Sequence, residues 1–188
     1  MDDYQKQVKD LVNQLIRIIF KSLCISEEEV NWFDDPTNMC NAALQLNSYP
    51  PCPDPARAVG LAPHTDSSLF IILHSRTEGL QIFKGLGWII VHPNPDALTV
   101  NLGDFLHILS NGRFVSVLHR AAVNQKYHRI SVAYLCWPPR DFIVSPLLSK
   151  TLADSGQVPK YRPVTLKEYS SLKAKHFQEA ISFVRADT

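Results

Sequence analysis

The chain has 188 residues, of which 45% are hydrophobic and 20% are charged, and its formal net charge is +1. This composition is typical of a globular protein of one domain, and it argues against extensive disorder. The balance of 19 basic and 18 acidic residues gives no indication of a nucleic-acid partner. The sequence contains no run of about 18 apolar residues, so it predicts no membrane span.

The N-terminal segment, residues 1–41, is predicted to be helical. Its apolar residues recur three or four positions apart, at Val8, Leu11, Val12, Leu15, Ile16, Ile19, Phe20 and Leu23. This spacing predicts an amphipathic helix with a wide apolar face. Ser26 and Glu29 form an S-x-x-E capping box, which predicts a short second helix.

Residues 42–140 are predicted to form a β-rich core. Short runs of Val, Ile, Leu and Phe alternate with Pro, Gly, Asn and Asp, and they predict strands at residues 44–49, 60–63, 69–74, 80–83, 88–91, 98–101, 117–123 and 130–135. Gly85-Leu86-Gly87 predicts a tight hairpin, because glycine tolerates positive φ. Many short strands at close intervals favour a barrel or a double-sheet sandwich over a parallel α/β sheet.

Residues 141–188 are predicted to form a C-terminal extension that packs on this core. Thr165 and Glu168 form a second capping box. Apolar residues then recur at helical spacing as far as Val184. The pattern predicts one amphipathic helix from Thr165 to Val184.

A candidate metal site begins with His64-Thr65-Asp66. Residues i and i+2 of an extended segment project to the same face, so the imidazole and the carboxylate can meet at one ion. His119 lies in another predicted strand and is a candidate third ligand. Two histidines and one carboxylate form the facial triad of non-heme Fe(II) oxygenases. A His-x-Asp triplet in a surface turn is the alternative.

A candidate anion site follows ten residues after His119. Arg129 and Ser131 share one face of an apolar strand, and an arginine directed into a core requires an anionic partner. A guanidinium and a hydroxyl can together bind a carboxylate, with the phenol of Tyr49 assisting. A structural salt bridge at Arg129 and a core tyrosine at Tyr49 remain as alternatives.

The remaining titratable candidates are predicted to be structural. His128 precedes Arg129, so strand alternation directs it to the opposite face. Asp104 is expected to stabilise a turn. Four other histidines have no partner at ligand spacing, namely His74, His92, His107 and His176.

These motifs together resemble the plant Fe(II)/2-oxoglutarate-dependent dioxygenases. The resemblance rests on Asn47-Ser48-Tyr49-Pro50, His64-x-Asp66, His119 and Arg129-x-Ser131, in this order. Within that family, residues 60–67, 106–114 and 161–177 resemble the gibberellin 3-oxidases (gibberellin 3-beta-dioxygenases), and the likeness extends from about Tyr4 to the C-terminus.

The resemblance implies a mainly β fold with flanking helices, built on a double-stranded β-helix, or jelly roll. It implies Fe(II) at His64, Asp66 and His119, and it implies 2-oxoglutarate held by Arg129 and Ser131 with help from Tyr49 and Asn47. It also implies O2 as oxidant, ascorbate as reductant, and 3-beta-hydroxylation of a gibberellin in plant hormone biosynthesis.

Two features of the chain depart from the resembling family. Val115 replaces a usual proline, and Trp137 is expected near the cavity mouth, where it would alter substrate fit. The chain also lacks the N-terminal region that usually precedes the first helix, so we expect an N-terminally truncated form with part of its apolar helix face exposed.

Several alternatives to this assignment remain open. The same chemistry can act on another gibberellin position or on a flavonoid-type substrate. A truncated, catalytically poor binding or regulatory form is a second possibility, and a zinc-binding jelly roll without oxygenase activity is a third. The cysteines show no Cys-x-x-Cys pair, and no secretory signal opens the chain. We therefore expect a cytoplasmic protein with reduced thiols. We also expect a monomer, and the resemblance implies a small hydrophobic carboxylic acid as its partner.

Overall fold

The computed structural model describes residues 2–26, 41–148 and 158–186. Its helices and strands, in chain order, are α1 (Asp2–Ser22), β1 (Asn41–Tyr49), η3 (Pro55–Arg57), β2 (Leu61–His64), β3 (Phe70–Ser75), β4 (Leu80–Lys84), β5 (Gly87–Ile90), β6 (Thr99–Leu102), α3 (Asp104–Leu109), β7 (His119–Ala121), β8 (Arg129–Trp137), β9 (Ile143–Val144), β10 (Val164–Thr165), α5 (Leu166–His176) and η4 (Phe177–Val184). Every predicted strand overlaps an observed one. The predicted capping box at Ser26 and Glu29 extends into residues outside the described ranges. No helix within those ranges is long and apolar enough to cross a membrane.

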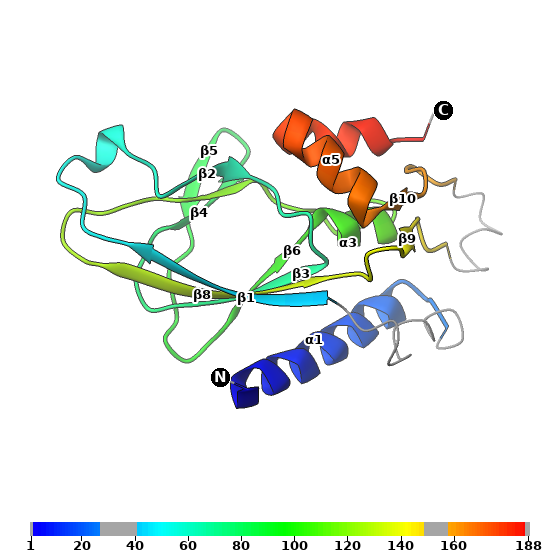
Figure 1. The fold of residues 1–188 in the computed structure, drawn as a ribbon, viewed down its shortest axis with the longest axis horizontal. Coiled ribbons are helices and arrows are strands. Elements are labelled where there is room, and N and C mark those ends of the chain that lie inside the picture. Colours follow the sequence, from blue (N-terminus) through cyan, green and yellow to red (C-terminus); the bar gives the residue numbers. More distant parts are fainter. Residues whose placement is uncertain (1, 27–40, 149–157, 187–188) are drawn as a thin grey trace.

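Two four-stranded antiparallel sheets form the jelly-roll core. The first has the strand order β1-β8-β3-β6 and the second the order β2-β7-β4-β5. They face each other as two layers, with α5 and η4 at one end (Figure 1). The expected hairpin joins β4 to β5, because Lys84 pairs with Gly87 and Gly85 has φ 64°. The predicted mainly β fold is therefore confirmed.

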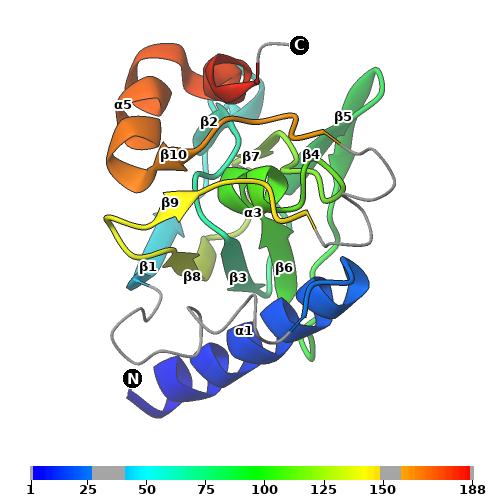
Figure 2. The same ribbon diagram turned by 90° about the vertical axis from the view of Figure 1, so that its right-hand side faces the viewer.

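Helix α1 packs across the outer face of the first sheet (Figure 2). Its apolar row is almost completely buried at Val8, Val12, Ile16, Phe20 and Leu23. These side chains belong to the same core cluster as sheet residues of β3 and β8. The expectation that this helix face lacks cover is therefore wrong for its central row, because the sheet covers it.

The C-terminal helix is interrupted, contrary to the prediction of one continuous helix. Thr165 caps α5 as expected, accepting a hydrogen bond from the Glu168 N–H at 3.2 Å. Helix α5 ends at His176, and Phe177, the first residue of η4, adopts φ 50°. The Arg162 N–H donates to the Val184 carbonyl at 2.9 Å. This long-range pairing draws the last turn away from the axis of α5, so tertiary contacts override local helical spacing.

Candidate active site

The pairing of β2 with β7 brings the two predicted histidine ligands together. His64 is the register partner of His119, and their ring centroids lie 4.3 Å apart. Asp66 follows two residues after His64, and its carboxylate lies 3.5 Å from His64 Nε2 and 3.3 Å from His119 Nε2. One ligand atom from each of the three residues lies within 4.8 Å of the others, and no other such group occurs in the described residues.

Each histidine of this group is oriented by a backbone carbonyl. His64 Nδ1 lies 2.7 Å from the Ala62 carbonyl oxygen, and His119 Nδ1 lies 3.0 Å from the Val117 carbonyl oxygen. Because a carbonyl oxygen only accepts, each Nδ1 must carry a proton, so the neutral form of each imidazole presents the lone pair of Nε2. Burial lowers the pKa of His64, but hydrogen bonds to Asp66 and Ala62 raise it, and the net pKa lies above the ordinary value.

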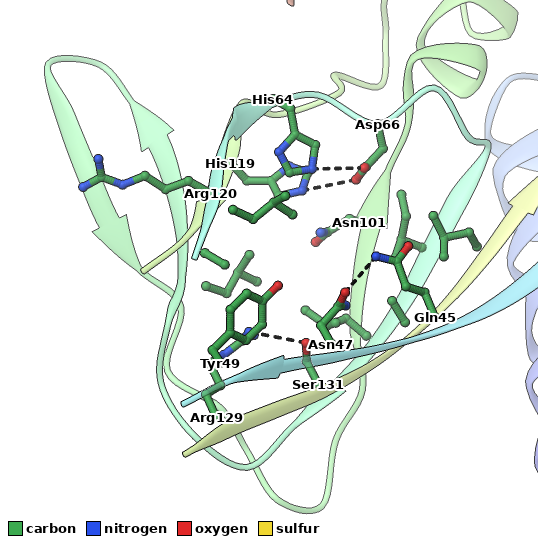
Figure 3. Close-up of a pocket in the computed structure, with 17 residues that line it drawn as sticks. Gln45, Asn47, Tyr49, His64, Asp66, Asn101, His119, Arg120, Arg129 and Ser131 are labelled. Atoms are coloured by element: carbon green, nitrogen blue, oxygen red, sulfur yellow. Dashed lines mark hydrogen bonds and ion pairs between the residues drawn. The ribbon is translucent and has the colours of Figure 1, made fainter. Parts of the chain in front are cut away.

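The pairing of β1 with β8 builds the opposite side of the same cavity (Figure 3). Asn47 is the register partner of Ser131, and Tyr49 is the register partner of Arg129. Strand alternation turns all four side chains inward. Arg129 and Ser131 are each only 2% exposed. The Arg129 guanidinium donates to Ser131 Oγ at 3.3 Å and lies 5.1 Å from the centre of the Tyr49 ring.

The Arg129 guanidinium is buried without an anionic partner. No carboxylate of the described residues forms a salt bridge with it, and its Nε atom has no hydrogen-bond partner. Burial lowers the pKa of Arg129, partly offset by Tyr49. A buried cation with an unpaired donor is costly unless a ligand supplies an anion. Arg129 and Ser131 therefore fit a carboxylate, and two imidazoles with one carboxylate fit a divalent transition metal.

A cavity of about 260 Å³ connects these two groups. Its wall is mostly apolar between them, with Ile71, Leu73 and Leu135 among the lining residues. Sequence reasoning missed three polar residues of this wall, namely Gln45, Asn101 and Arg120. The Gln45 amide donates to Asn47 Oδ1 at 2.7 Å. Strand alternation from Asn47 could have identified Gln45, whereas the position of Asn101 depends on its pairing with Ile71, which leaves no local pattern in the sequence.

The other predicted residues lie outside this cavity or have a different role there. His128 faces outward, as expected, within 2.8 Å of Ser48 Oγ. Trp137 is the last residue of β8, not a residue beyond it, and it packs against the core cluster. The expected place of Trp137 near the cavity mouth is wrong, because Trp137 is absent from the cavity wall. Val115 is 57% exposed and lines a neighbouring apolar cavity of about 310 Å³ that also reaches His119.

Asp104 is not a turn residue, contrary to the prediction. It is the first residue of α3 and only 2% exposed. Its carboxylate accepts hydrogen bonds from Tyr169 and Lys173 of α5. The turn prediction failed because a single sequence carries no signal of these contacts from a helix more than 60 residues away.

Comparisons with known proteins agree with this arrangement. The family described as the 2OG-Fe(II) oxygenase superfamily matches residues 40–138. Gibberellin 3-beta-dioxygenase 1 of Arabidopsis thaliana is 48% identical over 98% of this chain and 52% of its own length. Gibberellin 3-beta-dioxygenase 1 of Pisum sativum is 46% identical over 98% of this chain and 50% of its own. The chain thus spans about half the length of the curated relatives that it matches.

Two solved structures share the fold over nearly the whole chain. JOX2 in complex with 2OG, Fe and JA superposes with a TM-score of 0.88 at 31% identity, covering 99% of this chain and 56% of JOX2. The dioxygenase for auxin oxidation of rice superposes with a TM-score of 0.83 at 25% identity, covering 98% of this chain and 62% of the rice protein. With the family match over more than half of its residues, this chain belongs to the 2OG-Fe(II) oxygenase superfamily.

Proposed function

We propose that the chain is an Fe(II)- and 2-oxoglutarate-dependent dioxygenase that hydroxylates a gibberellin at the 3β position. The observation that supports this most directly is the cavity that holds His64, Asp66 and His119 opposite Arg129 and Ser131. The substrate class rests on the relatives that act on gibberellins, at up to 48% identity. The iron, when bound, supplies O2 activation coupled to oxidation of 2-oxoglutarate to succinate and CO2.

In this proposal the metal is held by His64, Asp66 and His119. The carbonyls of Ala62 and Val117 keep each Nδ1 protonated. Both Nε2 lone pairs are therefore directed at the position that Asp66 also faces. These three residues would hold the metal, and a two-histidine, one-carboxylate set of this kind is typical of Fe(II) oxygenases.

Arg129 and Ser131 bind the distal carboxylate of 2-oxoglutarate. The guanidinium offers charge-assisted hydrogen bonds, and the Ser131 hydroxyl can accept from Arg129 while donating to the ligand. Tyr49 adds a phenol beside the guanidinium, and Asn47 lies next along β1. The apolar wall between the two groups excludes water, which strengthens each of these interactions.

The gibberellin would approach from the second, apolar cavity that borders His119. Val100, Val115 and Val117 line this cavity, and His119 is the only ionisable residue among the described residues that line it. Such a surface suits a hydrophobic substrate held beside the metal ligands. Val115 therefore belongs to the proposed substrate side.

The test is succinate release with Fe(II), 2-oxoglutarate, O2 and ascorbate, measured with gibberellins that lack a 3β-hydroxyl. We expect a gibberellin to raise succinate above the uncoupled background and to gain one oxygen atom from labelled O2. His119→Ala should abolish this coupled turnover. His92→Ala is the matched control, because the His92 side chain is 76% exposed and forms an ion pair with Glu78 at 2.7 Å, away from the candidate ligands.

Other outcomes of the same assay identify the alternatives. Stimulation by a flavonoid or by auxin but by no gibberellin would overturn the substrate class and keep the chemistry. Metal and 2-oxoglutarate binding without turnover would support a catalytically poor binding form. Tight zinc binding with no affinity for 2-oxoglutarate would favour the zinc protein, which gives the buried Arg129 no role.

A further inference from the structure

A buried polar cluster lies directly behind the candidate metal ligands. Its centre is the Asp104 carboxylate, which is 2% exposed. Asp104 Oδ2 accepts hydrogen bonds from Thr65 Oγ1 at 3.1 Å and from the Tyr169 hydroxyl at 2.8 Å. Lys173 Nζ completes the cluster at 2.6 Å from the same oxygen. We call these four residues the Asp104 cluster.

The Asp104 cluster contacts the ligand loop at two points. Thr65, which lies between His64 and Asp66, also accepts a hydrogen bond from Lys173 Nζ. The Asp104 backbone N–H donates to the Asp66 carbonyl at 2.7 Å. The chain between the two ligands is therefore held through both its side chain and its backbone, by residues 39 and 108 positions downstream of Thr65.

The two charges of the Asp104 cluster compensate each other. The Lys173 side chain is only 18% exposed, and its ammonium lies 2.6 Å from the Asp104 carboxylate. A cation held this close to a dication site would disfavour the metal if Asp104 did not neutralise it. The pair can therefore orient Thr65 without adding net charge beside the ligands.

We propose that Lys173 and Asp104 are positioning residues for the metal ligands, through which α5 fixes the His64-Thr65-Asp66 loop in its binding geometry. This inference rests on the proposed function, since it concerns the same metal site. Within the described residues, Lys173 hydrogen-bonds Thr65 and Asp104 and none of the three ligands, so its effect is expected on metal affinity and ligand geometry.

The experiment compares Lys173→Met with Lys175→Met in Mn(II) titrations followed by the EPR signal of free Mn(II). Lys175 is an exposed residue of the same helix, so its variant controls for loss of one positive charge. We expect Lys173→Met to weaken Mn(II) about tenfold, as loss of an outer partner of a metal ligand does, and Lys175→Met to stay within about twofold. Lys173→Arg should restore most of the affinity.

A second variant separates positioning from a purely structural role. Thr65→Val removes the hydroxyl that links Lys173 to the loop. Because both variants break the same contact, the double variant Thr65→Val/Lys173→Met should lose little more affinity than either single variant. The visible spectrum of bound Co(II) should shift in the same variants, which a loss of stability alone does not produce.

The outcomes distinguish the positioning role of Lys173 from the proposed metal-dependent function. Folded Lys173→Met protein that binds Mn(II) as tightly as the wild type, with an unchanged Co(II) spectrum, would overturn the positioning role. Additive losses in the double variant would also contradict it. Wild-type protein that binds no Mn(II) would instead overturn the proposed function.

Discussion

The burial of the Arg129 guanidinium is unfavourable for folding, but it suits the proposed binding of 2-oxoglutarate. Residue Arg129 is 2% exposed, its Nε atom has no hydrogen-bond partner among the described residues, and its guanidinium donates to the neutral Ser131 Oγ. Residues that serve ligand binding in this way reduce the stability of the ligand-free protein. The ligand then restores the missing interactions.

We predict that Arg129→Met separates stability from ligand binding. The ligand-free variant should be as stable as the wild type or more stable by about 1 kcal/mol, because an unpaired buried cation is removed. Its affinity for 2-oxoglutarate should fall about 100-fold, because the carboxylate loses its charged partner. Urea unfolding measures the first effect, and ligand-induced thermal shifts measure the second. A variant that is strongly destabilised yet still binds 2-oxoglutarate would contradict this role for Arg129.

Seven candidate site residues could be predicted from the sequence, and the structure brings all seven to one cavity. Side-chain alternation predicted that His64 and Asp66 share a face, as do Arg129 and Ser131, whereas the family resemblance implied their roles and that of Asn47. Asn101 and Lys173 could not be predicted in the same way. Their positions depend on the register of β3 with β6 and on the docking of α5, and neither leaves a local pattern in one sequence.

At the scale of elements, strands were more predictable than the C-terminal helix. Short apolar runs bounded by turn residues identify a strand wherever its pairing partner lies. Helical spacing from Leu166 to Val184 is real, but the pairing of Arg162 with Val184 and the positive φ of Phe177 break the helix. A long-range contact of this kind is invisible to a periodicity argument.

Helix α1 provides a matched test of the packing on the first sheet. Ile16 is 2% exposed and Ile18 is 63% exposed. Ile16→Ala should lower the free energy of unfolding by about 3 kcal/mol, because it leaves a cavity in the core. Ile18→Ala should change the same quantity by less than about 0.5 kcal/mol. Chemical denaturation of both variants checks the prediction, and similar losses would show that α1 does not pack as described.

Helix α3 contains a histidine that should make stability depend on pH. Burial lowers the pKa of His107 below its ordinary value, and its Nε2 atom lies 2.6 Å from the Tyr161 hydroxyl. Below a pH of about 6.5 the unfolded chain binds a proton that the folded protein does not bind. The free energy of unfolding therefore decreases as the pH falls from about 6.5 through the lowered pKa that His107 has in the folded protein.

His107→Gln should reduce this dependence on pH. Loss of the Tyr161 contact lowers stability at every pH, but the variant has no imidazole to titrate. Urea unfolding at pH 7.5 and 5.5 should show a smaller loss on acidification in the variant than in the wild type. Equal losses in the two proteins would contradict the assignment of this pH effect to His107.

At the scale of the whole molecule, the site depends on both sheets at once. The second sheet supplies His64 and His119 from β2 and β7, and the first supplies Tyr49, Arg129 and Ser131 from β1 and β8. The jelly roll holds these two groups opposite each other (Figure 3). The central claim is that this cavity binds a divalent metal together with 2-oxoglutarate.

The most direct test is titration of the purified chain with Mn(II), with and without 2-oxoglutarate, alongside His119→Ala and His92→Ala. We predict one Mn(II) per wild-type chain, tighter binding when 2-oxoglutarate is present, and the same behaviour in His92→Ala. The affinity of His119→Ala should fall at least about 100-fold, because one of three ligands is lost. Wild-type protein that binds neither Mn(II) nor 2-oxoglutarate, or His119→Ala that binds like the wild type, would contradict the account.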